Sequence, residues 1–264
     1  MAEQQQKMTH TGVFRGKVVL VTGGGSGIGR AIAGAFAEAG ARVVVAGRGL
    51  DRLEETAAAI GGSAIRADVA DEASVAAMFA RLTAEEGGLD VLVNNAGVTG
   101  PVSNAEEMDM AAWDETVAIN IRGVLTCIKH AVPLLKVRGG GAIVNMSSLM
   151  GLRGYPMRAA YTATKFAVIG ITEAVAQEVG PFGIRVNALC PGAVNGALMQ
   201  RVVAARAAAE NRPEADIIRV NYTDKAALRR WVEPEEVAAV ALFLASPAAA
   251  AITGERIRVD AGRM

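Results

Sequence analysis

The chain of 264 residues has little of what builds disulfide frameworks, zinc clusters or serine-hydrolase triads. Its two cysteines, Cys127 and Cys190, lie among apolar neighbours, which favours reduced thiols packed in a core over a disulfide. Its two histidines are too few for the usual zinc clusters and argue against a Ser-His-Asp arrangement. We therefore expect no metal site and no hydrolase triad.

Net charge and long apolar runs are also missing. Lys+Arg and Asp+Glu balance at 27 each, so no net field favours nucleic acid or an anionic membrane as a partner. No uncharged apolar run approaches the roughly 18 residues that a membrane span needs. The polar start MAEQQQKMTHTG lacks the apolar stretch of a signal peptide. We expect a cytoplasmic protein, no membrane partner, and a flexible leader over residues 1–15.

Small aliphatic residues and glycine dominate instead, with 52% hydrophobic residues, 30 glycines and 4% aromatics. Short β-branched runs alternate with helical patterns along the chain, which predicts an α/β fold: a doubly wound (Rossmann) seven-stranded parallel sheet flanked by helices. The expected strands cover 17–23, 41–48, 63–69, 89–97, 140–148, 183–192 and 255–262, and the expected helices cover 29–40, 50–60, 71–86, 111–136, 158–179 and 233–246.

Domain organisation follows from the same pattern. No Pro/Gly/Ser linker or change in composition divides the chain, so we expect one domain over 1–264. The exception is 193–232, where no strand fits and charged, Ala-rich segments dominate. Because ligands of doubly wound folds bind beyond the carboxyl ends of the strands, we interpret 193–232 as a substrate-lid insertion. Four arginines there are expected on its solvated face: Arg201, Arg206, Arg212 and Arg219.

A glycine-rich turn, TGGGSGIG at 22–29, lies between the first expected strand and the first expected helix. Glycines let the backbone approach a pyrophosphate closely, and the free N–H groups at the helix start face the anion. Three residues separate the first two ordered glycines, so the spacing is TGxxxGxG and not GxGxxG. The turn predicts a nucleotide site that includes Gly23, Ser26, Gly27, Ile28 and Gly29.

A tyrosine and a lysine stand four positions apart in AAYTATKFAV, where Tyr161 and Lys165 share one face of the expected helix. Alone, that spacing is typical of any amphipathic helix. Ser148 precedes Tyr161 by 13 residues, and Asn120 lies in the preceding long helix. Ser147 is a rival for the serine position, but the register with Tyr161 favours Ser148. A phenol with a pKa of about 10 needs a nearby cation to act as a base, and Lys165 is the candidate.

These motifs, with NNAG at 94–97, resemble the short-chain dehydrogenase/reductase family from about residue 14 to the end. The resemblance implies an oxidoreductase that transfers a hydride between a nicotinamide cofactor and a secondary alcohol or ketone, commonly as a homotetramer. Tyr161 would be the general acid/base, and Ser148 would hydrogen-bond the reacting oxygen. Lys165 would also bind the nicotinamide ribose, and Asn120 would hold a water in a proton path.

The cofactor type depends on the end of the second expected strand. Gly47 stands where Rossmann sites often carry an acidic residue that binds the ribose hydroxyls, and Arg48 follows it. Without the carboxylate, Arg48 can pair with a 2′-phosphate, so NADP is favoured over NAD, although Arg48 as a solvated loop residue stays open. The resemblance adds further cofactor contacts at Asp68, Val69, Asn95, Ala96, Gly97, Tyr161, Lys165, Pro191, Gly192 and Val194. Asp68 as a helix cap is the alternative.

One departure from the family pattern lies in PGAVNG, where Gly196 replaces the threonine that often binds the nicotinamide carboxamide. Either the backbone or Asn195 takes over that contact, or the cofactor is oriented more loosely. We expect Gly196→Thr to tighten cofactor binding. Candidate substrate-binding residues are Ser148, Leu149, Tyr155 and Met199. Arg153 and Arg158 could meet an anionic substrate, although surface arginines are the simpler interpretation. A 3-oxoacyl thioester, a sugar or polyol, and a cyclic ketone stay open as substrates.

Two other classes of function compete with the oxidoreductase. A lyase or epimerase could use the same fold with transient oxidation, but such relatives usually carry a larger C-terminal substrate domain. A non-catalytic nucleotide sensor would not need Ser148, Tyr161 and Lys165 in register. Net turnover of the cofactor distinguishes the first class from both alternatives.

Overall fold

The computed structural model describes residues 12–263 and contains one seven-stranded sheet. Its order is β3-β2-β1-β4-β5-β6-β7, and every neighbouring pair is parallel. The predicted doubly wound sheet is thus confirmed. The strands are β1 (Val18–Thr22), β2 (Arg42–Gly47), β3 (Ser63–Arg66), β4 (Val91–Asn94), β5 (Gly141–Met146), β6 (Ile184–Pro191) and β7 (Arg256–Val259).

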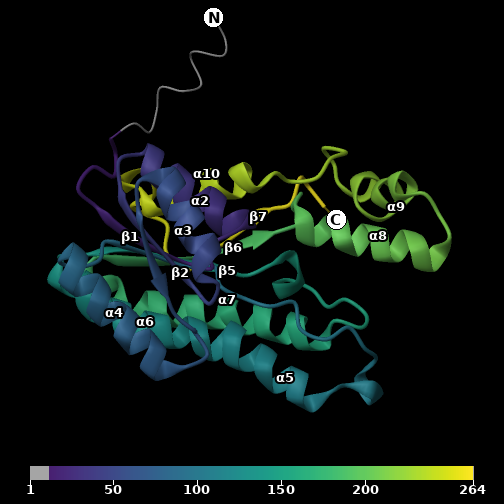
Figure 1. Cartoon of the computed structure of the whole chain (residues 1–264), viewed down its shortest axis with the longest axis horizontal. Helices are drawn as coiled ribbons and strands as arrows, with labels where there is room; N and C mark the ends of the chain where they lie inside the picture. The colour runs from purple at the N-terminus through teal and green to yellow at the C-terminus, as the bar shows by residue number, and fades with distance from the viewer. Residues whose placement is uncertain (1–11, 264) are drawn as a thin grey trace, which may run out of the picture.

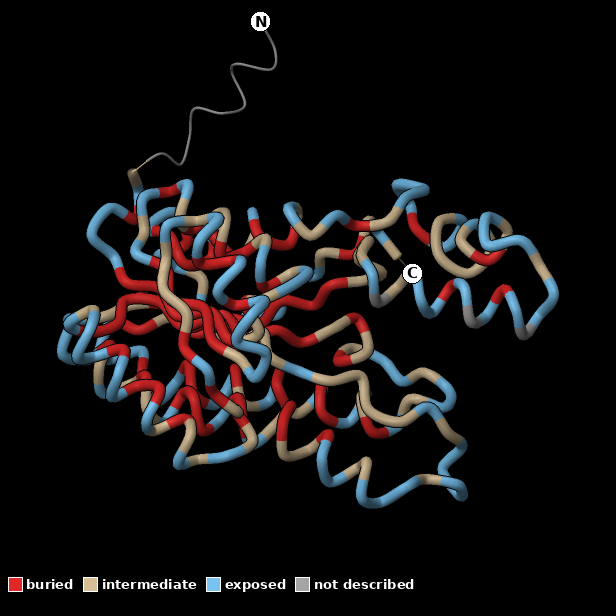
Figure 2. Tube along the Cα trace, in the orientation of Figure 1, coloured by how far each residue is buried: buried red, intermediate tan, exposed pale blue. Residues whose placement is uncertain are grey.

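Helices cover both faces of the sheet (Figure 1). One layer comprises α2 (Gly27–Glu38), α3 (Leu50–Ile60) and α10 (Pro234–Ala245), and the other comprises α4 (Glu72–Glu86), α6 (Gly123–Val137) and α7 (Ala159–Val179). Alternate residues of β1 face opposite layers: Val19 and Val21 join the first core, and Val18 and Leu20 join the second. Figure 2 shows the buried strands between the exposed outer faces of the helices.

The strand order places the nucleotide turn at the centre of the sheet. The chain leaves β1 toward β2 on one side, while β4 pairs with β1 on the other side. At this reversal the connections diverge and leave a crevice beyond the carboxyl ends of the strands. The turn after β1 and the NNAG segment after β4 therefore border the same crevice.

The expected leader over 1–15 is wrong at its carboxyl end. Phe14 is buried, and its ring packs edge-on against Phe36 with centroids 5.0 Å apart. The Gly12 and Phe14 N–H groups both donate to the Ala39 carbonyl. Residues 12–15 are thus fixed to α2 by an aromatic contact that the polar composition of the leader hides. Residues 1–11 lie outside the described part of the chain.

The long helix expected over 111–136 is continuous but contains an irregular turn. It consists of α5 (Met110–Val117), a π-helical turn η2 (Ala118–Arg122) and α6. By length and composition alone, Met110–Val137 could cross a membrane, although Arg122 and Lys129 interrupt its apolar character. The core helix of a soluble protein can have the same length and composition, and this helix packs on the sheet through Ile128, Ala131 and Leu135.

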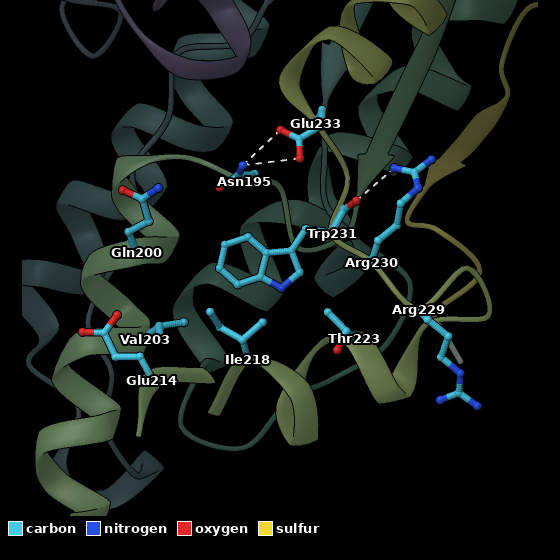
Figure 3. A pocket seen from close by; sticks show the side chains of 10 residues that line it. All are labelled: Asn195, Gln200, Val203, Glu214, Ile218, Thr223, Arg229, Arg230, Trp231 and Glu233. Atoms are coloured by element: carbon cyan, nitrogen blue, oxygen red, sulfur yellow. Dashed lines mark hydrogen bonds between the residues drawn. The ribbon is translucent and has the colours of Figure 1, made fainter. Parts of the chain in front are cut away.

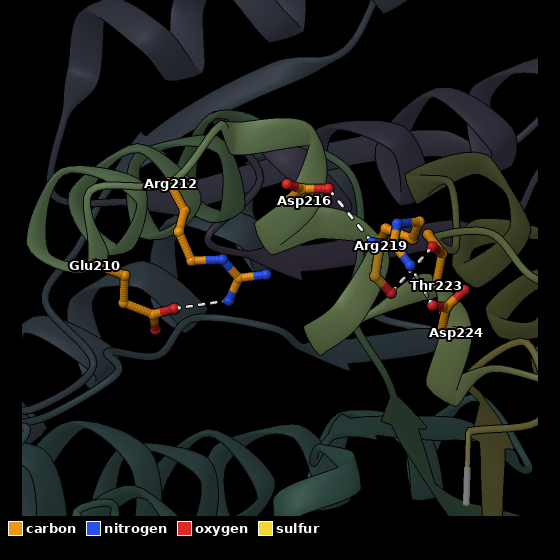
Figure 4. Close-up of polar contacts among 6 residues, drawn as sticks. All are labelled: Glu210, Arg212, Asp216, Arg219, Thr223 and Asp224. Carbon is orange, nitrogen blue, oxygen red and sulfur yellow. Dashed lines mark hydrogen bonds and ion pairs between the residues drawn. The ribbon is translucent and has the colours of Figure 1, made fainter.

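The 193–232 region forms α8 (Ala197–Glu210) and α9 (Glu214–Asn221), which extend beyond the end of the sheet (Figure 1). They share a small core of Val203, Ala207 and Ile217. Of the four arginines expected on its solvated face, Arg206 and Arg212 pair with Glu210, and Arg219 pairs with Asp216 and Asp224 (Figure 4). The 3₁₀ turns of the chain are η1 (Ala105–Glu107), η3 (Leu149–Gly151), η4 (Gly180–Phe182), η5 (Thr223–Lys225) and η6 (Pro247–Ala249).

Candidate active site

The glycine turn is held tightly against the end of β4. A Cβ on Gly23 would lie 2.8 Å from Asn95 Nδ2, and a Cβ on Gly29 would collide with the Gly23 carbonyl oxygen. Asn95 Nδ2 donates to the carbonyl oxygens of Thr22 and Gly23 at 3.1 and 3.2 Å. Gly27, in contrast, has a φ of +51° and open space beside it. Gly23 and Gly29 thus allow close packing, whereas Gly27 leaves room for an anion at the start of α2.

A cleft of about 220 Å³ opens beside this turn. Its lining includes six residues predicted to bind a cofactor: Gly23, Arg48, Asp68, Val69, Ala96 and Gly97. The remaining lining residues are Gly47, Gly49, Arg52, Ala67, Val98 and Ile119. Sequence reasoning missed Arg52, which lies in the first turn of α3, four residues after Arg48. The cleft therefore presents two guanidinium groups and no acidic residue at position 47.

Asp68 also forms hydrogen bonds within the loop that follows β3. Its Oδ1 accepts a hydrogen bond from the Ala70 N–H at 3.0 Å, and its N–H donates to Ser74 Oγ at 2.9 Å. The helix cap of α4 is a different residue, Asp71. Asp68 thus orients the loop that borders the cleft, so the structural and cofactor-binding interpretations are compatible.

The two candidate serines separate clearly. Ser147 is buried, and its hydroxyl donates to the Lys165 carbonyl at 2.8 Å, which ties β5 to α7. Ser148 is the N-cap residue of η3, where its Oγ accepts from the Met150 N–H at 3.1 Å, and its hydroxyl lowers the pKa of the Tyr161 phenol. The structure therefore brings Ser148, not Ser147, to Tyr161, as the register indicates.

The electrostatics of Tyr161 differ from the expectation. Burial raises its pKa above the ordinary value of a phenol, while the Ser148 hydroxyl and the charge of Arg158 lower it. Lys165 Nζ lies 5.5 Å from the centroid of the Tyr161 ring and donates to the Met146 carbonyl at 2.8 Å. Burial lowers the Lys165 pKa to about 8. Arg158 is thus a second cation beside the phenol: its guanidinium carbon lies 5.4 Å from the Tyr161 ring centroid, about as close as Lys165 Nζ.

Asn120 lies buried in the π-helical turn. Its Oδ1 accepts from the Val98 N–H, and its Nδ2 donates to the Val98 carbonyl, both at 2.9 Å. Nδ2 also donates to Thr164 Oγ1 at 3.1 Å. The side chain thus joins the loop after β4 to α7, one residue before Lys165. Functional sites often contain such π turns.

The loop after β6 disagrees with the expectation for Gly196. This glycine has a φ of +152°, a backbone conformation that β-branched residues rarely adopt, so threonine here would strain the chain. The Asn195 amide is also engaged, donating to the Glu233 carboxylate at 3.1 and 3.3 Å. Asn195 and the backbone were the two groups expected to replace the threonine, and of these the Val194 backbone is free to bind. The bonds to Val232 are formed by the Ala193 carbonyl and the Asn195 N–H. Pro191 and Gly192 are the last residue of β6 and its successor.

Asn195 and Glu233 also line a cleft of about 380 Å³ in the lid, with the Trp231 indole at its centre (Figure 3). None of the four predicted catalytic residues lines this cleft. Among the substrate candidates, Leu149 is buried in η3 and Met199 is half-buried on α8. The Tyr155 hydroxyl accepts from Arg153 Nε at 3.0 Å.

Comparison with known proteins identifies the family. A family model described as enoyl-(acyl carrier protein) reductase matches residues 23–263. An uncharacterized oxidoreductase of Thermotoga maritima is 40% identical over 94% of this chain and 98% of its own length. The chain belongs to the short-chain dehydrogenase/reductase family. It is a nicotinamide-dependent oxidoreductase that acts on CH–OH or C=O groups.

The family includes proteins with different substrates. Cis-4-hydroxycyclohexanecarboxylate dehydrogenase of Sinomonas cyclohexanicum is 39% identical over 94% of this chain and 97% of that protein. A solved structure described as ribose-5-phosphate isomerase from Brucella melitensis 16M is 38% identical, with a TM-score of 0.87 over 96% of this chain and 93% of that one. Family membership therefore identifies the reaction class, whereas the substrate has to be inferred from the residues of this chain.

Proposed function

We propose that this protein is an NADP-linked oxidoreductase of secondary alcohols and ketones, with Tyr161 as its general acid/base. The observation that carries the proposal is the placement of Tyr161 beside Ser148, whose hydroxyl lowers the phenol pKa, with Lys165 Nζ 5.5 Å from the Tyr161 ring centroid. The cleft at the carboxyl ends of β1 and β4 lies beside them: a Cβ on Gly97, which lines it, would be 3.6 Å from Lys165 Nζ.

The residues present fit a dinucleotide. The open space at Gly27 and the N–H groups of Gly27 and Ile28 would receive the pyrophosphate, with Ser26 at the helix cap. Arg48 and Arg52 would bind the 2′-phosphate, while Asp68 and Val69 would lie along the adenine. The Val194 backbone would bind the carboxamide. The bound cofactor supplies the hydride acceptor or donor, and the remaining chemistry is proton transfer by the chain.

Proton transfer would run through the phenol. In alcohol oxidation Tyr161 Oη takes the hydroxyl proton, and in ketone reduction it returns a proton to the carbonyl oxygen. Ser148 Oγ stabilises the charge that develops on that oxygen. Lys165 would bind the nicotinamide ribose. Asn120, whose amide already holds Val98 and Thr164, would position Lys165 and contact a water only with its remaining hydrogen-bond capacity.

The direct test is absorbance of the reduced nicotinamide with a panel of ketones and secondary alcohols, using NADP and NAD in parallel. We expect net cofactor turnover, with NADP preferred. Conversion of a substrate without net turnover would instead support an epimerase or isomerase, the activity for which the Brucella melitensis structure is described. Cofactor binding without any conversion would support a nucleotide sensor.

A further inference from the structure

Arg158 occupies an unusual place beside the candidate catalytic phenol. It immediately precedes α7, three residues before Tyr161, and its guanidinium carbon lies 5.4 Å from the centroid of the Tyr161 ring. The preceding residue, Met157, has a φ of 61°, which is rare for a long side chain. The Thr162 N–H donates to the Arg158 carbonyl at 2.8 Å and fixes the start of the helix. The backbone is thus ordered at Arg158, and the guanidinium lies near the Tyr161 ring.

The charge of Arg158 has no carboxylate partner within residues 12–263. Three arginines of the lid do: Arg206 binds Glu210, and Figure 4 shows Arg212 bound to Glu210 and Arg219 beside two aspartates. Arg158 is less exposed than Arg206 or Arg219, yet its Nε is buried without any hydrogen-bond partner. A guanidinium cannot lose its proton in a protein, so a half-buried one without an acceptor is unfavourable unless a ligand supplies the acceptor.

The surroundings of Arg158 on the lid side are rich in donors. Its charge acts on Tyr222, which follows α9, and Tyr222 packs edge-on against Trp231 with ring centroids 5.7 Å apart. Around Tyr222, the buried atoms without partners in the described chain include the donors Asn221 Nδ2 and Trp231 Nε1. A neutral polyol would need acceptors as well as donors, whereas an anion needs donors only.

We propose that Arg158 binds a carboxylate of the substrate, so that the enzyme acts on hydroxy acids or oxo acids in preference to neutral alcohols. This inference rests on the proposed oxidoreductase function. The carboxylate stays unchanged while the neighbouring carbinol loses its hydride to the cofactor and its proton to Tyr161. A carboxylate matches one planar guanidinium with two parallel hydrogen bonds. A phosphate dianion would favour a second cation. Lys165, the other cation near the phenol, donates to the Met146 carbonyl. Arg263, whose guanidinium carbon lies 5.3 Å from the Tyr222 ring centroid, already donates to the Asn221 carbonyl at 3.1 Å.

The test compares acids with their neutral amides of the same size, namely 4-hydroxycyclohexanecarboxylate and 3-hydroxybutyrate against the corresponding carboxamides. We expect kcat/KM of the wild type to favour the acid by about 10- to 100-fold, the range of a charged hydrogen-bonded pair. In Arg158→Gln this ratio should fall to within about threefold of unity, through KM of the acid. Arg206→Gln is the matched control, because Arg206 is exposed on α8, pairs with Glu210 and should leave the ratio unchanged.

Each other outcome has a definite meaning. Equal turnover of acid and amide by the wild type overturns the inference, even if Arg158→Gln fails to fold. An equal loss on both substrates in Arg158→Gln, with the kcat profile moved to higher pH, would assign Arg158 to the phenol alone. A larger Arg158-dependent preference for a phosphorylated alcohol, tested with glycerol 3-phosphate, would overturn the carboxylate assignment. If neither cofactor is reduced with any acid, amide or neutral alcohol, the proposed function itself fails.

Discussion

Arg48 carries the cofactor preference at the scale of single residues, because it stands beside a glycine where an acidic residue would repel a 2′-phosphate. It is exposed at the cleft and forms no ion pair within residues 12–263. We expect Arg48→Asp to lower the ratio of NADP to NAD efficiency by about 100-fold, since a favourable charge pair becomes a repulsive one. Steady-state kinetics with both cofactors measure this ratio, and Arg81→Asp on the outer face of α4 is the control. An unchanged ratio would contradict the NADP assignment.

Lys165 offers a pH-dependent test. Its pKa falls from 10.5 in a free side chain to about 8 in the folded protein, because burial disfavours the charged form. Between pH 8 and 10.5 the unfolded chain binds more protons, so the free energy of unfolding rises with pH through this window. Below pH 8, Lys165 is protonated in both states, and burial of its charge lowers the free energy of unfolding by its full amount, about 3 kcal/mol. Urea unfolding of the wild type relative to Lys165→Met should reveal the rise, and a pH-independent difference would refute it.

Some site residues could be predicted from the sequence, and others could not. The glycine turn, Ser148, Tyr161 and Lys165 could be located because each has a local motif or a fixed spacing. The charge interaction of Arg158 with Tyr222 joins segments more than 60 residues apart and leaves no periodic signal. The φ of Gly196 was hidden for a similar reason, since glycine is compatible with any backbone conformation.

At the scale of elements, the sequence predicts the strands and helices to within a few residues, because β-branched runs and helical periodicity alternate clearly. The third expected strand ends early: residues 67–69 leave the sheet to border the cofactor cleft. The π turn at Asn120 was not predicted, because it depends on bonds from one amide to the loop after β4. Side-chain contacts across elements thus set the irregular positions.

The π turn leads to a stability prediction. We expect Asn120→Ala to lower the free energy of unfolding by about 1–3 kcal/mol, because it leaves the Val98 N–H and carbonyl unpaired in a partly buried loop. Thr126→Ala, elsewhere on the same long helix, controls for a generic loss of packing. Urea unfolding measures both variants. A residue that only held a water would leave the stability of Asn120→Ala close to that of the wild type.

For the whole molecule, we propose one domain that assembles as a homotetramer in the cytoplasm. Exposed apolar residues on the α6–α7 layer, Leu125 and Phe166, suit a contact between copies, and isolated exposed apolar residues would also fit a monomer. Light scattering coupled to size exclusion should give a mass near four times 27.2 kDa. Phe166→Glu should dissociate the assembly, with Phe182→Glu on η4 as the control. A monomeric wild type would contradict the proposal.

The central claim is that Tyr161 moves the proton that accompanies hydride transfer. The most direct measurement is single-turnover reduction of NADP by Tyr161→Phe with the best alcohol of the panel, beside cofactor binding by the same variant. The account predicts that Tyr161→Phe still binds the cofactor, while its rate is reduced at least about 100-fold, the contribution of a positioned acid/base. It also predicts that wild-type alcohol oxidation accelerates with rising pH as the phenol ionises. Hydride transfer by Tyr161→Phe at the wild-type rate would contradict the account.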